Sequence, residues 1–250
     1  MSVDKERPGV PEAWRRLAEL TPARIALGRS GSGLPTREVL KFAMAHAQAR
    51  DAVHAPFDAP SLAARVAELG PAAIEIASAA PVREVYLRRP DLGRRLDATS
   101  ALALDALEPK GADLAVVIAD GLSATAVELN AVPVLGALMP YLRAMPLSLA
   151  PVAIATGGRV ALGDEIGARL GARMVLVLIG ERPGLSAPDS LGAYLTFAPR
   201  VGRSDAERNC VSNIRLGGLG HEIAAARLAW LIEAAFRRGL PGPTKSKPVP

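Results

Sequence analysis

Hydrophobic and polar positions change their spacing along the chain, and the change divides it into two parts. Beyond residue 110, two apolar runs of six residues, 114–119 and 174–179, are rich in β-branched side chains and predict strands buried on both faces, as in a parallel sheet. The expected strands are 113–119, 147–154, 174–179 and 192–197, and the expected helices are 124–138, 162–170 and 221–238. Strands that alternate with helices predict an α/β fold with a Rossmann-like parallel sheet, right-handed crossovers and flanking helices.

The first part of the chain is predicted to be smaller and mostly helical. Helices are expected at 10–20, 35–54, 60–69 and 91–107, with one or two short strands within 72–86. The Glu-Pro-Lys-Gly break at 108–111 is expected to be the domain boundary. The predicted units are an N-terminal arm (1–23), a helical region (24–108), a Rossmann-like domain (109–240) and a Pro- and Lys-rich disordered tail (241–250).

Composition narrows the class of protein. Half of the 250 residues are apolar, so the chain can bury a large core. No apolar run approaches the length of a membrane span, and the first eight residues are polar with mixed charge, so neither a membrane segment nor a secretory signal is expected. The single cysteine, Cys210, excludes an internal disulfide and favours a reducing compartment. These features predict a soluble cytoplasmic protein.

The formal net charge of +5 does not predict a nucleic-acid partner. The arginines are scattered, and only 4% of the residues are aromatic. A protein that binds single strands uses aromatic side chains to stack on the bases, together with a clustered basic surface. The planar guanidinium group of arginine makes two hydrogen bonds at once to a carboxylate or a phosphodiester, so contacts with an acidic protein surface or a phosphodiester are the favoured role of these arginines.

Charged residues stand directly after the apolar runs, and ligands bind at the carboxyl ends of strands in open α/β sheets. Glu181 and Arg182 follow the run 174–179. A solvated pair is the simpler interpretation, but the flanking glycines permit close approach of a ligand. Asp120-Gly121-Leu122-Ser123 follows the other run, and Ser123 is a candidate N-cap of the next helix. Two interpretations of this segment are possible: a capped turn between a strand and a helix, or the wall of a ligand pocket.

Other motifs of nucleotide and metal chemistry are incomplete. Residues 28–33 have the glycine spacing of a P-loop, but Leu34-Pro35 stands where Lys-Ser/Thr is required, and no G-x-G-x-x-G follows a predicted strand. The three histidines are dispersed, so no metal site is expected. Cys210 has no histidine close in sequence, which favours a packing residue over a nucleophile.

Five segments, in this order along the chain, resemble the small subunit of ethanolamine ammonia-lyase, which depends on adenosylcobalamin. They are 86–96, 120–123, 158–160, 180–184 and 208–214, and the resemblance extends over about residues 24–236. It implies that Glu181 accepts hydrogen bonds from the amide side chains of the corrin. It further implies that Cys210 and Val160 pack against the cofactor and that Arg182 is an additional contact.

The resemblance also implies the state of the cofactor, the partner and the reaction. No histidine has an aspartate two residues before it, so the D-x-H-x-x-G motif of histidine-ligated cobalamin proteins is missing and the base-on form of adenosylcobalamin is expected. The family converts ethanolamine to acetaldehyde and ammonia in the TIM barrel of a large subunit, so no catalytic residue is expected in this chain. Partner contacts are assigned to 24–108 and cobalamin binding to 109–240.

Several alternatives stay open. The arginine pairs 88–89 and 94–95 are explained either by local ion pairs with Glu84 and Asp91 or by contacts with the partner. An independent α/β enzyme would use Glu181 or Asp120 as a general base. A corrinoid-free structural or regulatory subunit would bind the partner alone. The short arm leaves both the cytoplasm and a bacterial microcompartment as locations.

Overall fold

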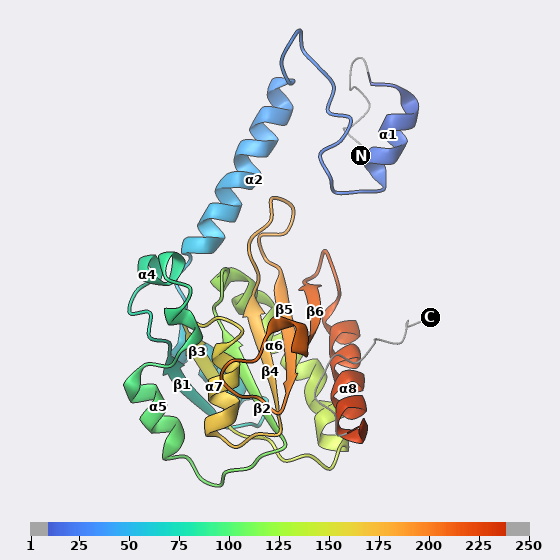
Figure 1. The fold of residues 1–250 in the computed structure, drawn as a ribbon. Helices are drawn as coiled ribbons and strands as arrows, with labels where there is room; N and C mark the ends of the chain where they lie inside the picture. The colour runs from blue at the N-terminus through green and yellow to red at the C-terminus, as the bar shows by residue number, and fades with distance from the viewer. Residues whose placement is uncertain (1–9, 239–250) are drawn as a thin grey trace.

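The structure is a computed structural model that describes residues 10–238, so the disordered tail predicted at 241–250 lies outside the described residues. A central sheet carries helices on both faces, and one long helix projects from the carboxyl edge of the sheet (Figure 1). The predicted class, a mixture of α and β with helices around a sheet, is confirmed.

The sheet has six strands in the order β1-β3-β2-β4-β5-β6. The strands are β1 (Ala73–Ala77), β2 (Leu114–Ala119), β3 (Val152–Thr156), β4 (Met174–Gly180), β5 (Leu191–Phe197) and β6 (Arg208–Ile214). The first four in this order are parallel, but β5 is antiparallel to both β4 and β6. The prediction of a purely parallel sheet is therefore wrong. Only the loop 181–190 joins β4 to β5, and a parallel pair would need a longer crossover.

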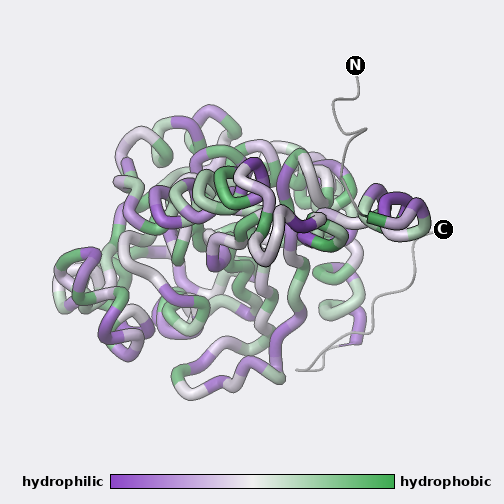
Figure 2. Tube along the Cα trace, turned by 90° about the horizontal axis from the view of Figure 1, so that it is seen from above, coloured by the Kyte–Doolittle hydropathy of each residue, from purple (hydrophilic) through white to green (hydrophobic). Residues whose placement is uncertain are grey.

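Eight α-helices occur among the described residues: α1 (Glu12–Glu19), α2 (Thr36–His54), α3 (Ala59–Ala67), α4 (Arg83–Arg88), α5 (Ala98–Asp105), α6 (Ala124–Ala144), α7 (Leu162–Arg169) and α8 (His221–Arg238). Short 3-10 helices occupy Leu92–Arg94 and Asp205–Glu207. Helices α3, α6 and α8 cover one face of the sheet, and α5 and α7 cover the other. Seen from above, hydrophobic and hydrophilic positions lie side by side along the helical turns (Figure 2), as in helices at a core–solvent boundary.

The alternation of side chains in β2 explains how the two faces differ. Leu114, Val116 and Ile118 point to the α6 face. The α7 face receives Val117 and the two alanines at 115 and 119, so its side chains are smaller on average. Small residues let α7 approach the sheet closely. A Cβ added at Gly163 of α7 would lie 2.3 Å from Val177 of β4, so the α7 backbone itself packs on the strand. By length and composition α6 is apolar enough to cross a membrane, yet ten of its residues are buried in this core.

Some elements differ from the sequence-based expectation. Strand β1 pairs along its length with β3, so the sheet includes a strand that precedes the boundary expected at 108. Strand β6 was expected to be only a polar segment. It is a strand because Val211 and Ile214 face the core and Arg208 enters a buried ion pair, while its other polar residues are partly or fully exposed.

Candidate functional site

The carboxyl edge of the sheet contains a topological switch point. From β2 the chain passes through α6 to β3 on one side, and from β3 through α7 to β4 on the other side of β2. Helices α6 and α7 lie on opposite faces of the sheet, so the loops that join them to the strands diverge above β2 and β4. Open α/β sheets bind ligands at such a position. Asp120 follows β2 and Glu181 follows β4, so both predicted segments lie at this edge.

The backbone of residues 120–123 packs directly against the end of β4. Leu122 N donates to Gly180 O at 2.9 Å, and a Cβ at Gly180 would lie 2.1 Å from Ser123 O. Ser123 is the N-cap of α6, as predicted, since its hydroxyl accepts from Ala126 N at 3.1 Å. The contact between residues 120–123 and the end of β4 divides the carboxyl edge into two halves. One half lies above strands β4, β5 and β6 (the β4–β6 half), and the other above β1, β2 and β3 (the β1–β3 half).

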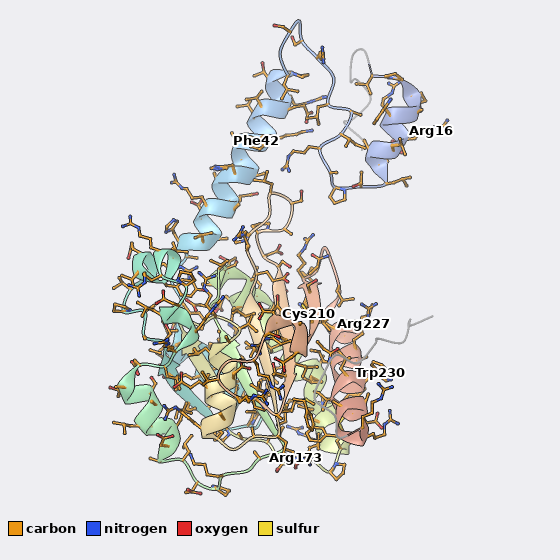
Figure 3. The ribbon with its side chains drawn as sticks, viewed as in Figure 1. Arg16, Phe42, Arg173, Cys210, Arg227 and Trp230 are labelled. Carbon is orange, nitrogen blue, oxygen red and sulfur yellow. The ribbon has the colours of Figure 1, made fainter. Side chains whose placement is uncertain are left out.

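On the β4–β6 half, side chains from three strands form a row. Tyr194 of β5 is paired with Val177 of β4 and with Cys210 of β6, so these three share the face that α7 covers further down. Glu181 continues the alternation of β4 on this face, two residues beyond Ile179. Figure 3 shows Cys210 at this position on β6.

Glu181 is half-buried and held by defined partners. Its Oε2 accepts from the Ser190 hydroxyl and from Asn213 N, the latter at 3.2 Å. Gly192 on the neighbouring strand makes room for it, because a Cβ there would lie 3.0 Å from Glu181 Oε1. The carboxylate is therefore fixed by groups from the 181–190 loop and β6, and Oε1 is its less engaged oxygen.

Cys210 is exposed and is hydrogen-bonded to Tyr194. Partial burial of the sulfur raises the pKa of the Cys210 thiol, and the negative charge of Glu181 raises it further, against a lowering by Tyr194. Burial, then Cys210 and Glu181, raise the pKa of the Tyr194 phenol. Both groups are thus neutral near pH 7, and Cys210 is not an activated nucleophile.

Val160 reaches the same face from the turn between β3 and α7. It is half-buried and packs, with Tyr194, against the hydrophobic cluster under α7. Gly158 allows this turn to approach β2, because a Cβ at residue 158 would lie 2.9 Å from Ala119 Cβ. The structure therefore gathers Val160, Glu181 and Cys210 on one face. Arg182 is exposed, and no ion pair joins it to another described residue.

A buried ion pair that the sequence did not predict lies beneath this row. Arg208 of β6 forms two bonds of 2.6 Å with the carboxylate of Asp164 in α7, and it also donates to the Thr196 hydroxyl at 2.8 Å. The two charged side chains are 2% and 1% exposed. The pair fixes β6 against α7 two residues before Cys210. The only hint of it in the sequence is that Arg208 and Cys210 are two residues apart, so both point to the same face of a strand.

On the β1–β3 half, Asp120 is buried against Arg83. Asp120 Oδ2 lies 3.1 Å from Arg83 Nη1, and Oδ1 accepts from Gly158 N at 3.1 Å. Burial raises the pKa of Asp120 to about 6, although Arg83 and the backbone donors lower it. The guanidinium carbons of Arg83 and Arg159 lie 4.9 and 4.3 Å from the centre of the Tyr86 ring. Only Asp120 of this cluster was a candidate from the sequence.

Comparison with known proteins identifies the family. The family model for the ethanolamine ammonia-lyase light chain matches residues 11–244. The chain belongs to this family. Proteins named "Ethanolamine ammonia-lyase small subunit" from Ralstonia nicotianae and Bradyrhizobium diazoefficiens are 57% and 58% identical to it, each over 90% of this chain and over 84% and 87% of their own lengths. The protein of that name from Pseudomonas syringae pv. tomato is 54% identical over 96% of this chain and 84% of its own length.

The resemblance inferred from the five segments is thereby confirmed, and so is the assignment to a subunit of an ammonia-lyase complex. A small subunit of ethanolamine ammonia-lyase implies a large-subunit partner. Arg89 pairs with Asp91 through two bonds of 2.9 and 2.7 Å, so the local ion pair that the sequence offered for this arginine is present.

Proposed function

We propose that this small subunit binds adenosylcobalamin, in its base-on form, on the open face formed by Val160, Glu181, Tyr194 and Cys210. The observation that supports the proposal most strongly is convergence. Val160, Glu181 and Cys210 come from three separate segments of the sequence, and they share one face beside the switch point. Arg182, exposed one residue beyond Glu181, is the fourth residue assigned to the cofactor.

The chemistry of this face suits the edge of a corrin. The ring has an apolar surface bordered by amide side chains that donate hydrogen bonds. Glu181 is an acceptor whose Oε2 is already bound and whose Oε1 is available to an amide. Val160 supplies apolar cover, and Cys210 and Tyr194 stay uncharged because burial raises the pKa of each. No sequence motif offers a histidine to replace the cofactor's own base, which favours the base-on form.

We assign this chain a binding role and no catalytic residue. When bound, the cofactor supplies the radical chemistry that converts ethanolamine to acetaldehyde and ammonia, in the TIM barrel of the large subunit. Here Glu181 orients the cofactor, and Val160 and Cys210 shield it from water. Asp120 does not suit a general base, because its side chain is 6% exposed and both its oxygens are engaged.

The partner surface is assigned to the N-terminal region. More than half of the exposed large hydrophobic side chains lie in residues 14–44, and Leu40 and Met44 on α2 are 64% and 63% exposed. Figure 3 shows Phe42 on the part of α2 that projects beyond the sheet. Apolar surface concentrated on a projecting helix marks a protein interface. We assign it to the large subunit, with no nucleic acid and no membrane as partner.

The complex is assigned to the cytoplasm, because a single cysteine suits a reducing compartment. Encapsulation in a bacterial microcompartment is the second location that the family allows.

The decisive experiment measures acetaldehyde released from ethanolamine with adenosylcobalamin present. It compares this chain alone, this chain with a cognate large subunit, and the complex with Glu181→Ala. Activity is expected only in the complex. The variant should raise the apparent KM for the cofactor about tenfold or more, since a hydrogen bond to a charged group contributes roughly 1.5–3 kcal/mol, with a smaller effect on kcat.

Glu68→Ala is the matched control, because Glu68 is exposed at the end of α3, away from this face. It should leave the cofactor KM unchanged. An associated, folded complex without activity or cofactor binding would favour the corrinoid-free regulatory subunit. Turnover by the chain alone would favour the independent enzyme.

A further inference from the structure

The loop 181–190, which joins β4 to β5, is anchored to α6 by a buried asparagine. Asn130 is 2% exposed, and its Nδ2 donates to Asp189 O at 2.9 Å. Asp189 directly precedes Ser190, the residue whose hydroxyl bonds the Glu181 carboxylate. A side chain of α6 therefore meets the loop next to the group that holds Glu181.

Each end of the Asn130 amide has a partner. Its second N–H donates to Ala126 O at 2.9 Å, one turn earlier in α6, and its Oδ1 lies 2.8 Å from Nε2 of His221 at the start of α8. Since an amide oxygen only accepts, His221 Nε2 carries the proton of this bond. Two carbonyl acceptors and one donor around the amide determine which of its ends is the nitrogen, so its orientation is fixed.

The bond to Asp189 O constrains the residue that follows it. A peptide group is planar, so the carbonyl of Asp189 and the N–H and Cα of Ser190 lie in one plane. By fixing that carbonyl, Asn130 fixes the plane from which the Ser190 side chain starts. Ser190 O also accepts from Glu181 N at 2.9 Å, so the two ends of the loop are tied to each other and, through Asn130, to α6.

The core does not explain why residue 130 is an asparagine. Nine of the ten buried residues of α6 are apolar, and Asn130 is the tenth. Asparagine is a poor helix former, and burying an amide costs free energy unless its hydrogen bonds are made. The bonds to the loop and to α8 are what an apolar residue could not supply. Ser123 also donates to Pro188 O at 2.9 Å, so α6 holds two successive carbonyls of the loop.

We infer that Asn130 is a positioning residue for the cofactor, which holds the 189–190 peptide so that Ser190 orients the Glu181 carboxylate. It acts through Ser190 and Glu181 and lies on the α6 side of the sheet, whereas Glu181 faces the α7 side. The inference rests on the proposed cofactor role of Glu181. It adds that cofactor affinity depends on α6 and α8, on the face of the sheet opposite the cofactor.

Two variants separate the loop bond from the rest of the network. Asn130→Leu has the same branched shape and favours the helix, but it has no polar atoms. Asn130→Asp keeps an acceptor for His221 and replaces the donor to Asp189 O by an oxygen. Val134→Ala is the matched control, because Val134 is buried on the same helix, four residues further from the carboxyl edge. Removing its methyl groups lowers stability without removing a bond to the loop.

Hydrogen exchange of the free chain measures how firmly Glu181 is held, with no cofactor present. Asn213 N donates to Glu181 Oε2 at 3.2 Å, and Glu181 N donates to Ser190 O at 2.9 Å. Both amides should exchange about threefold faster or more in the two Asn130 variants, relative to the amides of β2, because the loop opens locally once its anchor is lost. In Val134→Ala they should change no more than the amides of β2 do.

The complex with the large subunit gives the second readout, the apparent KM for adenosylcobalamin. Both Asn130 variants should raise it about threefold to tenfold and leave the KM for ethanolamine unchanged, since a bond between neutral groups contributes less than one to a charged group. Val134→Ala should change neither value. In a Glu181→Ala background, Asn130→Leu should have no further effect on the cofactor KM, because it acts through that carboxylate.

Unchanged exchange at the Glu181 and Asn213 amides would overturn the inference. So would an unchanged cofactor KM in the Asn130 variants when Glu181→Ala raises it, or an effect of Asn130→Leu that adds fully to that of Glu181→Ala. A cofactor KM that Glu181→Ala leaves unchanged would overturn the proposed cofactor site, and with it the cofactor role of Asn130. The exchange experiment distinguishes the two failures, because it does not involve the cofactor.

Discussion

The buried pair between Arg208 and Asp164 should contribute several kcal/mol to the stability of the folded chain. Asp164→Ala would leave a guanidinium whose side chain is 2% exposed without its two bonds of 2.6 Å, and arginine does not lose its charge in proteins. Breaking a buried ion pair from one side costs about 3–5 kcal/mol. In a chain of this size each kcal/mol lowers Tm by about 2–4 °C, so we expect Tm to fall by about 6–20 °C.

The opposite substitution should cost less. Arg208→Met leaves Asp164 in the first turn of α7, where the helix dipole stabilises a carboxylate by up to about 1 kcal/mol. Asp164→Leu combined with Arg208→Met removes both charges and should be more stable than either single variant, because no uncompensated charge remains. Thermal and urea unfolding, followed by the fluorescence of Trp14 and Trp230, would measure these differences.

Asp91→Ala is the control, because it breaks the exposed pair with Arg89, whose side chains are 60% and 55% exposed. Exposed pairs of this kind contribute little, so its unfolding midpoint should stay near that of the wild type. The reasoning would be refuted if Asp164→Ala shifted the midpoint no more than Asp91→Ala, or if the double substitution were the least stable variant. A displaced β6 should also weaken cofactor binding, since Cys210 follows Arg208 in the strand.

Three further predictions concern the sheet edge and α2. Burial raises the pKa of Asp120 from 3.8 to about 6, so this group stabilises the fold most below about pH 4, and its contribution is lost as pH rises through 6. The free energy of unfolding, measured in urea at several pH values, should therefore fall across this range, and Asp120→Asn should abolish that fall. Gly121→Ala places a Cβ 2.3 Å from a backbone carbonyl and should cost about 1–3 kcal/mol in thermal unfolding, more than Gly202→Ala, which has a positive φ but open space; equal costs would contradict the reasoning. Leu40→Lys with Met44→Lys should weaken association with the large subunit about tenfold or more without changing the unfolding midpoint, and unchanged affinity in sedimentation experiments would remove α2 from the interface.

The sequence predicted the elements whose side chains face a single environment. β2 and β4 are apolar on both faces because helices cover both, and their runs at 114–119 and 174–179 match the strands closely. β6 was not predicted to be a strand, because the residues on each of its faces lie in different environments. Arg208 forms a buried ion pair and Cys210 is exposed. A register shift between Val211 and Ile214 lets both of these apolar residues enter the core, so no simple alternation is visible.

The candidate site shows the same limit. Glu181 and Asp120 were predictable because each follows an apolar run, and the carboxyl ends of parallel strands share one edge. Arg83 and Asp164 were not, because each meets its partner from a distant part of the chain: Arg83 bonds Asp120, and Asp164 bonds Arg208. Pairing across such distances depends on strand order, and β5 shows that one short loop is enough to reverse a strand and change that order.

The position of β1 in the sheet also determines when this strand can form its hydrogen bonds during synthesis. β1 forms its hydrogen bonds with β3, and the ribosome makes β3 only after β2 and the 21 residues of α6. Strand β1 therefore leaves the ribosome before the strand it pairs with, and α2 before α6, which it contacts; the apolar side chains of α2 are exposed throughout that interval. A nascent large subunit or a chaperone that covers α2 at this stage would protect the chain from aggregation, so the yield of soluble protein should depend on co-expression with the partner.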